Sequence, residues 1–187
     1  MGLKKYNILE LFDKSPIITS KMIKKRIKND YYKLLIKNLL DKKEIFRVSK
    51  GNYSKFDDPS LFVFTVKPAY LGLHDAMSIH NIWEQETCSV ILTVKKVRVG
   101  LRKTDCGNVI IKNIKNKYLF GIVYIEFENF YLPYSDIEKT LIDMVYYNEY
   151  LDKKVINKFK SKMDMKKFNK YLLKYPVVFQ NKVKRII

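Results

Sequence analysis

Apolar residues recur every three or four positions along the first 40 residues, and lysines fill the positions between them. This period predicts three short amphipathic helices. The first covers residues 3–13, the second begins at the N-cap candidates Thr19 and Ser20, and the third begins at Asn29-Asp30. The residues expected to face inward are Met22, Ile23 and Ile27 in the second helix, and Tyr31, Leu35, Leu39 and Leu40 in the third.

A β-hairpin is predicted directly after these helices. Ile45, Phe46 and Val48 favour a strand, residues 50–52 (Lys-Gly-Asn) favour a turn, and residues 53–56 favour a return strand. Three helices followed by a hairpin is the order of a winged helix-turn-helix, in which the third helix enters the major groove and the hairpin forms a wing. The alternative is a three-helix packing unit with an added hairpin.

The pattern changes after residues 57–59 (Asp-Asp-Pro), which we take as a domain boundary. Residues 68–82 predict a helix with a close-packing Gly72, and residues 89–97 predict a strand that is apolar on both faces and therefore central in a sheet. Residues 108–114 and 117–127 predict further strands. A helix is expected after Pro133 with Ser135 as its N-cap, followed by two lysine-rich helices broken near residues 161–164. The predicted fold class is α+β, with a winged helix-turn-helix over residues 1–58 and a mixed α+β domain over residues 59–187.

The distribution of charge along the chain supports this division into two domains. The 187-residue chain has 37 basic and 19 acidic residues, a net charge of +18. Residues 1–58 carry 15 basic and 7 acidic side chains, and residues 132–187 carry 13 and 6, whereas the middle of the chain is close to balance. Two basic flanks around a neutral middle indicate contact with a polyanion through particular surfaces.

The candidate DNA-binding residues lie around the predicted third helix and the hairpin. Lysine and arginine can contact phosphates or guanine edges, and asparagine can read adenine. The candidates are Lys21, Lys24, Lys25, Lys28, Asn29, Tyr32, Lys33, Lys37, Arg47, Ser49, Lys50, Asn52 and Lys55.

Other chemistry has weaker signals. Asp105, Glu126 and Glu128 could line the metal site of a nuclease, but no lysine stands at the neighbouring position that such chemistry favours. His74 and His80 are spaced for packing, and Cys88 and Cys106 lack a C-x-x-C spacing, so we expect free thiols and no metal site. There is no P-loop, nucleophile elbow or dinucleotide fingerprint. We therefore expect no catalysis and no cofactor.

Three segments resemble a known family. They are residues 51–53 (Gly-Asn-Tyr) at the wing, residues 74–83 (HDAMSIHNIW) and residues 132–147 (LPYSDIEKTLIDMVYY). Over roughly residues 5–160 the chain resembles the AbiEi-type antitoxin and transcriptional-regulator family of viral defence systems. The resemblance implies a cytoplasmic protein that represses its own operon and neutralises a nucleotidyltransferase-type toxin.

The most specific part of the resemblance contains Glu138, Lys139 and Asp143. Lys139 and Asp143 are four residues apart on a helix and can pair. Two roles are open for this cluster: to cap the helix and hold it to the sheet, or to contact a partner protein. The lysines of the last helices (Lys158, Lys162, Lys166, Lys170 and Lys174) could likewise form a second polyanion-facing stripe above Phe159, Met163, Phe168, Leu172 and Leu173, or a solvated face.

The expected function is therefore DNA binding by a cytoplasmic, autoregulating, antitoxin-like repressor. Its expected partner is double-stranded DNA, with a cognate toxin and a homodimer as further candidates. The chain has no apolar run long enough to span a bilayer, so no membrane association is expected. The alternatives are a protein-interaction module that neutralises a toxin and, less favoured, a metal-dependent nuclease.

Overall fold

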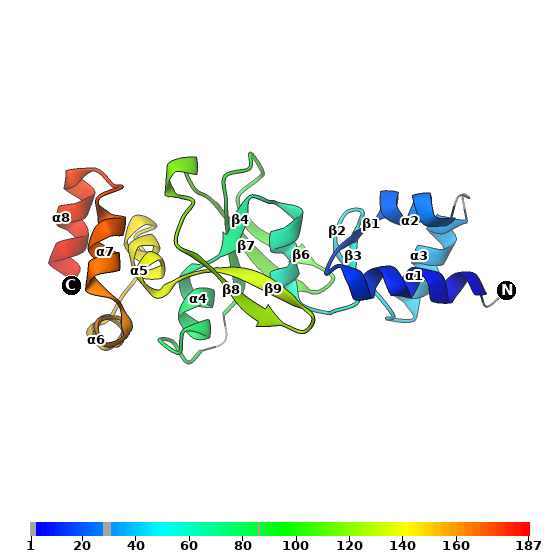
Figure 1. Cartoon of the computed structure of the whole chain (residues 1–187), viewed down its shortest axis with the longest axis horizontal. Coiled ribbons are helices and arrows are strands. Elements are labelled where there is room, and N and C mark those ends of the chain that lie inside the picture. The colour runs from blue at the N-terminus through cyan, green and yellow to red at the C-terminus, as the bar shows by residue number, and fades with distance from the viewer. Residues whose placement is uncertain (1–2, 28–30, 86) are drawn as a thin grey trace.

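The chain extends along one long axis, with its first helices at one end, a sheet in the middle and its last helices at the other end (Figure 1). The computed structural model describes residues 3–27, 31–85 and 87–187. It is a mixed α+β structure with two sheets, which agrees with the predicted class. No helix in these ranges has the length and apolar composition needed to cross a membrane.

The described residues among 3–54 form three helices and a small antiparallel sheet in the order β1-β3-β2. The elements are α1 (Leu3–Lys14), β1 (Ile18–Thr19), α2 (Ser20–Ile27), α3 (Tyr32–Asp41), β2 (Phe46–Ser49) and β3 (Asn52–Ser54). The predicted helices and hairpin are thus confirmed. The Thr19 hydroxyl accepts a hydrogen bond from the Met22 N–H (3.2 Å), as an N-cap does.

The core of this N-terminal unit is narrower than predicted. Ile23, Leu35 and Leu39 are buried, but Met22 is 43% exposed and Tyr31 is 40% exposed. The prediction that both face inward is wrong: α2 has only eight residues and buries the stripe around Ile23, and Tyr31 is the N-cap of α3, ahead of its buried stripe of Leu35, Ile36 and Leu39. The predicted cap Asn29-Asp30 lies outside the described residues.

The central sheet has the strand order β6-β7-β5-β4-β9-β8. Its strands are β4 (Ala69–Leu71), β5 (Ser89–Thr93), β6 (Gly100–Thr104), β7 (Gly107–Asn113), β8 (Ile122–Phe127) and β9 (Phe130–Ser135). β5 lies inside the sheet, parallel to β7 and antiparallel to β4, as its apolar run predicts. Along β5, Val90 and Leu92 pack into one hydrophobic cluster and Ile91 packs into the other, so both faces of the sheet are covered.

The predicted helix over residues 68–82 is only partly correct. Its first part is β4, and only Leu73–Ile79 is helical (α4). Pairing with β5 and β9 favours the strand at Ala69–Leu71 over the local helical pattern. The predicted close packing of Gly72 is confirmed, since a Cβ there would lie 2.5 Å from the Leu92 Cδ1.

Further elements pack on each face of the central sheet. A 3-10 segment, η1 (Pro59–Thr65), and Val48 of β2 pack on one face of the sheet. The other face carries α4 and four further helices: α5 (Ile137–Tyr146), α6 (Lys153–Lys162), α7 (Met165–Leu172) and α8 (Val177–Ile186). A short 3-10 turn, η2 (Asn116–Tyr118), precedes β8. Ser135 ends β9 and is not the N-cap of α5; that role belongs to Asp136, whose carboxylate accepts from the Lys139 N–H at 2.8 Å.

Candidate nucleic-acid interface

The exposed side of α2 is strongly basic. Lys21, Lys24 and Lys25 are all exposed, and each belongs to the predicted phosphate-contacting set. The Lys24 Nζ lies 5.8 Å from the centre of the Tyr32 ring, which joins α2 to the start of α3. Tyr32 is half-buried in this contact, so its ring supports the helix pair rather than standing free. Lys28 lies outside the described residues.

The exposed side of α3 combines charged, polar and apolar side chains. Lys33 and Lys37 are exposed, one turn apart, on the side opposite the buried Leu35, Ile36 and Leu39. Leu34 and Asn38 share this exposed side, and Leu34 is 50% exposed. Neither was among the predicted site residues, although a helical wheel of α3 would have placed both there. Asn29 lies outside the described residues.

The hairpin turn lies against the beginning of α2. Gly51 has a φ of +76°, and its carbonyl accepts hydrogen bonds from the Ser20 N–H (2.9 Å) and the Ser20 hydroxyl (3.3 Å). The Asn52 side-chain amide donates to the Ser49 hydroxyl at 2.8 Å and to the Lys50 carbonyl at 3.3 Å. Ser49 and Asn52 thus shape the turn.

Two hairpin cations are presented to solvent, and a third is paired. Arg47 and Lys50 are exposed. The Lys55 Nζ lies 2.9 Å from Asp13 Oδ1, so Lys55 ties the hairpin to α1. The contacts of Ser20 and Lys24 therefore bring α2, α3 and the hairpin together, and their exposed cations form what we call the N-terminal basic surface: Lys21, Lys24, Lys25, Lys33, Lys37, Arg47 and Lys50.

The second predicted cluster, Glu138, Lys139 and Asp143, lies in the interior of the protein. Lys139 and Asp143 form an ion pair with no exposed side-chain surface, as their spacing predicts. The Tyr70 hydroxyl of β4 donates to Asp143 Oδ2 (2.7 Å) and accepts from Lys139 Nζ (2.9 Å). Burial lowers the pKa of Lys139 and raises the pKa of Asp143, and the attraction between the two groups partly opposes both changes.

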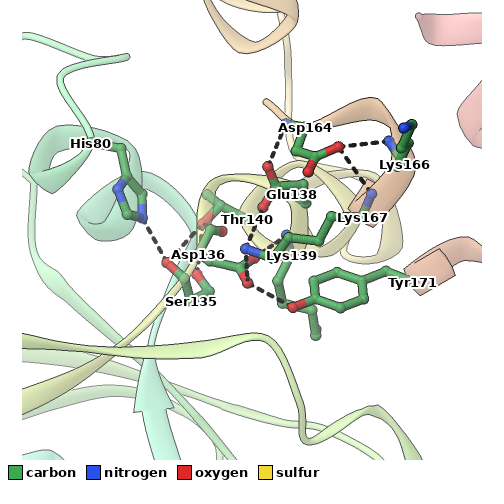
Figure 2. Close-up of polar contacts among 10 residues, drawn as sticks. All are labelled: His80, Ser135, Asp136, Glu138, Lys139, Thr140, Asp164, Lys166, Lys167 and Tyr171. Atoms are coloured by element: carbon green, nitrogen blue, oxygen red, sulfur yellow. Dashed lines mark hydrogen bonds and ion pairs between the residues drawn. The ribbon is translucent and has the colours of Figure 1, made fainter. Parts of the chain in front are cut away.

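A second layer of polar contacts joins α5 to α7 (Figure 2). The Lys167 Nζ lies 3.0 Å from Asp136 Oδ2 and 2.9 Å from Glu138 Oε2. Glu138 Oε1 accepts from the Asp164 N–H at 2.7 Å, and the Tyr171 hydroxyl donates to Asp136 at 2.8 Å. Desolvation lowers the pKa of Lys167, but its hydrogen bonds to Glu138 and Asp136 outweigh that effect and raise it. Glu138 is thus engaged inside the chain.

The acidic candidates for a nuclease site do not come together. Asp105 follows β6 and Glu126 lies on β8, and these are the two opposite edges of the sheet. Glu128 lies in the β8–β9 turn and not on the strand face of Glu126. Across the described ranges, no three His, Cys, Asp or Glu side chains form a group that could hold a metal ion.

The histidines and cysteines have ordinary contacts. His74 packs edge-on against the Trp83 ring, and a ring nitrogen of His80 lies 2.7 Å from the Ser135 carbonyl oxygen (Figure 2). Cys88 is exposed and Cys106 is buried, and both are free thiols.

The C-terminal lysines are partly engaged in internal contacts. Lys158 pairs with Glu84 (2.7 Å), Lys162 donates to the carbonyl oxygens of His80 (2.8 Å) and Asn81 (3.1 Å), and Lys174 lies 3.9 Å from the centre of the Phe120 ring. Lys166 and Lys170 are exposed. Of the apolar residues expected beneath them, Phe159, Met163, Phe168 and Leu172 are buried, whereas Leu173 is 75% exposed, which corrects that prediction.

Comparison of the sequence with models of known protein families and with curated protein sequences finds no match.

Proposed function

We propose that the protein binds double-stranded DNA through its N-terminal basic surface and represses transcription. The observation that carries the proposal is the exposed side of α3, which presents Lys33, Lys37, Asn38 and Leu34 next to a basic helix and a basic hairpin. In this proposal residues 1–58 act as a winged helix-turn-helix domain, with α3 as the recognition helix and the β2–β3 hairpin as the wing.

The side chains on α3 match the groups that a major groove offers. Asn38 can read an adenine edge, Lys33 and Lys37 can contact guanine or phosphate, and Leu34 can pack on a thymine methyl group. The cations of α2 and the hairpin supply phosphate contacts, which orient the protein without reading sequence. Changes to α3 should therefore alter sequence specificity, whereas changes to α2 or the hairpin should alter the affinity for any DNA.

We propose further that the DNA-binding protein is an antitoxin-like repressor of its own operon. The resemblance of residues 51–53, 74–83 and 132–147 to the AbiEi-type family supports this role. Within the Glu-Lys-x-x-x-Asp segment, the buried contacts of Lys139 and Asp143 favour a structural role over direct contact with a toxin.

The proposal is tested by measuring binding of the full chain to the DNA upstream of its own gene and to scrambled DNA of equal length, across a salt series. We expect at least tenfold preference for the upstream DNA at moderate salt. Equal binding to both DNAs, with a steep loss of binding as salt rises, would contradict the proposal. It would show that the positive charge of the protein neutralises DNA phosphates without regard to sequence.

Two double variants separate the roles of the surface. Lys33→Ala/Lys37→Ala should remove most of the preference for the upstream DNA. Arg47→Ala/Lys50→Ala should weaken binding to both DNAs alike. The slope of log binding constant against log salt concentration should fall in magnitude by about one for each phosphate that the hairpin no longer neutralises. Lys153→Ala/Lys154→Ala is the matched control, because these exposed lysines at the start of α6 carry the same charge far along the chain.

A second candidate function, toxin neutralisation, rests on exposed apolar side chains at the α7–α8 corner. Leu173, Val177 and Val178 are 75%, 67% and 83% exposed. They lie at the opposite end of the molecule from the N-terminal basic surface (Figure 1). A partner held there would leave the DNA-binding end open. Loss of toxin neutralisation in Val177→Ser/Val178→Ser, with DNA binding retained, would support this candidate.

A further inference from the structure

A cleft of about 400 Å³ separates the β2–β3 hairpin from the edge strand β6. Four of its lining residues are basic: Arg47 and Lys50 come from the hairpin, and Arg102 and Lys103 come from β6. Arg102 pairs with Val109 and lies on the sheet face of the cleft, whereas Lys103, the next residue of the strand, points its side chain to the other face. Arg102 and Lys103 are 55 or more residues beyond Arg47 in the sequence, so the fold assembles this group of charges.

The basic groups of the cleft lack acidic partners. In the part of the chain that the structure describes, none of the four is in an ion pair. The Arg102 guanidinium donates to the Arg98 carbonyl at 2.6 Å, which orients it from one side only. Asp105, at the β6–β7 turn, is the acidic residue in the lining. The charges of Arg47, Lys50 and Arg102 around a concave surface create a positive potential that favours a multiply charged anion.

The rest of the lining suits an organic body attached to that anion. The Ser49 hydroxyl accepts from Asn52 and keeps its hydrogen to donate, whereas the Thr65 and Thr104 hydroxyls already donate to the carbonyl oxygens of Phe62 and Gly107, each at 2.8 Å. Buried Val48, Phe62 and Ile111 form an apolar wall. The lining is more polar than that of most small-molecule sites, which suits a charged ligand, and a volume of about 400 Å³ is within the usual range of such sites.

We infer that this cleft binds a small phosphate monoester of about the size of a mononucleotide. The phosphate group contacts the arginines, whose planar guanidinium groups donate paired hydrogen bonds to phosphate oxygens. Lys50 adds charge from the hairpin wall of the cleft. The organic part of the ligand packs against the apolar wall.

The ligand also has a regulatory consequence, which rests on the proposed function. Arg47 and Lys50 belong both to the cleft and to the N-terminal basic surface. A phosphate bound by these two side chains competes with DNA phosphates for them. The ligand therefore weakens DNA binding, and saturating DNA weakens ligand binding by the same factor.

The direct test measures binding of adenosine monophosphate, adenosine and inorganic pyrophosphate to the full chain by calorimetry at moderate salt. Adenosine monophosphate joins a phosphate dianion to a flat organic ring, and adenosine lacks the charge. We expect adenosine monophosphate to bind at least tenfold more tightly than adenosine, and pyrophosphate to compete with it. No binding of either phosphate compound would overturn the inference.

Variants locate the site. Arg102→Gln/Lys103→Gln should weaken binding of adenosine monophosphate at least tenfold, whereas Lys153→Gln/Lys154→Gln, which removes the same charge elsewhere, should leave it unchanged. Arg102→Gln alone changes one half-buried side chain on the cleft face of β6 and is the variant to use if the double variant does not fold. Equal loss in the cleft and control variants would overturn the inference, because it would reflect overall charge.

DNA binding distinguishes this inference from the proposed function. Adenosine monophosphate should weaken DNA binding by the wild-type chain, and Arg102→Gln/Lys103→Gln should bind DNA normally but no longer respond to it. If the nucleotide does not bind and Arg102→Gln/Lys103→Gln weakens DNA binding, the cleft holds a DNA phosphate and the inference is wrong. If the nucleotide binds in the cleft but the protein does not bind DNA, the ligand site stands and the proposed function fails.

Discussion

The Lys139 ammonium and the Asp143 carboxylate lie in the interior between α5 and β4, where water does not reach them. Each group depends on the other and on the Tyr70 hydroxyl for compensation. Removing one partner leaves an uncompensated buried charge, which is far more costly than replacing the whole pair with apolar side chains.

Lys139→Met should therefore lower the free energy of unfolding by about 3–5 kcal/mol. The double variant Lys139→Met/Asp143→Leu should recover most of this loss, because no buried charge is left unpaired. Chemical denaturation of the wild type, both single variants and the double variant measures the coupling. Losses that simply add would show that the two groups act independently.

Asp75 is a second interior carboxylate, at the start of α4. Its Oδ2 is buried with no hydrogen-bond partner among the described residues, and the Tyr134 hydroxyl lies 3.5 Å from Oδ1. Burial raises the pKa of Asp75 to about 7. The folded protein keeps this proton up to about pH 7, whereas the unfolded chain releases it near pH ~4. Wild-type stability should therefore fall as the pH rises between these values.

Asp75→Asn removes this penalty, since asparagine is neutral at every pH. Its stability relative to the wild type should rise by about 1.4 kcal/mol for each pH unit between pH ~4 and ~7, and then level off. Denaturation curves at a series of pH values measure the difference. Asp105→Asn, at an exposed turn, is the control and should show no comparable rise.

Several elements end where the backbone turns left-handed. Lys43, Asn81 and Asn148 have φ values of 53°, 54° and 55° and follow α3, α4 and α5 closely. Such residues end helices by giving the last carbonyls new hydrogen-bond partners. Gly121, with a φ of +67°, makes a similar turn before β8 and lies directly against the Lys139 side chain.

Gly121→Ala should destabilise the protein more than Gly100→Ala. Both glycines have positive φ, so both variants carry backbone strain. Only at Gly121 would the new Cβ collide, at 2.8 Å from the Lys139 Cβ, whereas Gly100 has nothing within 4 Å. The clash should add about 1–3 kcal/mol to the loss of unfolding free energy. Equal losses measured by thermal or chemical denaturation would show that the neighbouring helix yields without cost.

The elements with a strong local pattern were predictable, and those made by long-range pairing were not. β5 has a continuous apolar run and β8 alternates, so periodicity alone predicts both. β4 is a three-residue strand whose partner β9 lies some 60 residues later, and no local signal encodes that pairing. β6 (Gly-Leu-Arg-Lys-Thr) is an edge strand that depends on β7 for its conformation.

The candidate site, too, was predictable only where its residues are close together in the sequence. The basic residues of α2, α3 and the hairpin are contiguous in sequence, and counting charges finds them. The cleft is different, because Arg102 and Lys103 come from a strand that the sequence did not predict. The burial of Glu138 could not be predicted from the local sequence either, because its partners Asp164 and Lys167 lie on a separate helix.

Across the whole molecule, aromatic packing connects the N-terminal unit to the sheet. Phe56 follows β3, and its ring centre lies 6.0 Å from that of Phe127 and 5.5 Å from that of Phe130. Val48 of β2 is fully buried in the same hydrophobic cluster. These contacts hold the hairpin against the sheet and keep the walls of the cleft in place.

Phe56→Ala should loosen this connection and leave both hydrophobic cores folded. We expect faster proteolytic cleavage near residues 57–58 and a broader distance distribution in small-angle X-ray scattering. Tyr131→Ala, which truncates a 57% exposed aromatic residue on β9, is the control and should change neither result. Unchanged scattering in Phe56→Ala would mean that the other contacts of the N-terminal unit with the sheet, those of Val48, Phe46 and Ile17, maintain the orientation.

The straight arrangement of hairpin, sheet and terminal helices makes the molecule a spacer of set length (Figure 1). Aromatic contacts join its first part to the sheet, the Tyr70 hydroxyl of β4 joins the sheet to α5, and Lys167 joins α7 to α5, so a continuous chain of contacts connects the two tips. If the protein binds DNA at one end and a toxin at the α7–α8 corner, as proposed, the toxin would be held at a constant height above the DNA. Neighbouring copies on one DNA would then display their cargo with the spacing of their binding sites, so operator geometry would dictate how the captured molecules face one another.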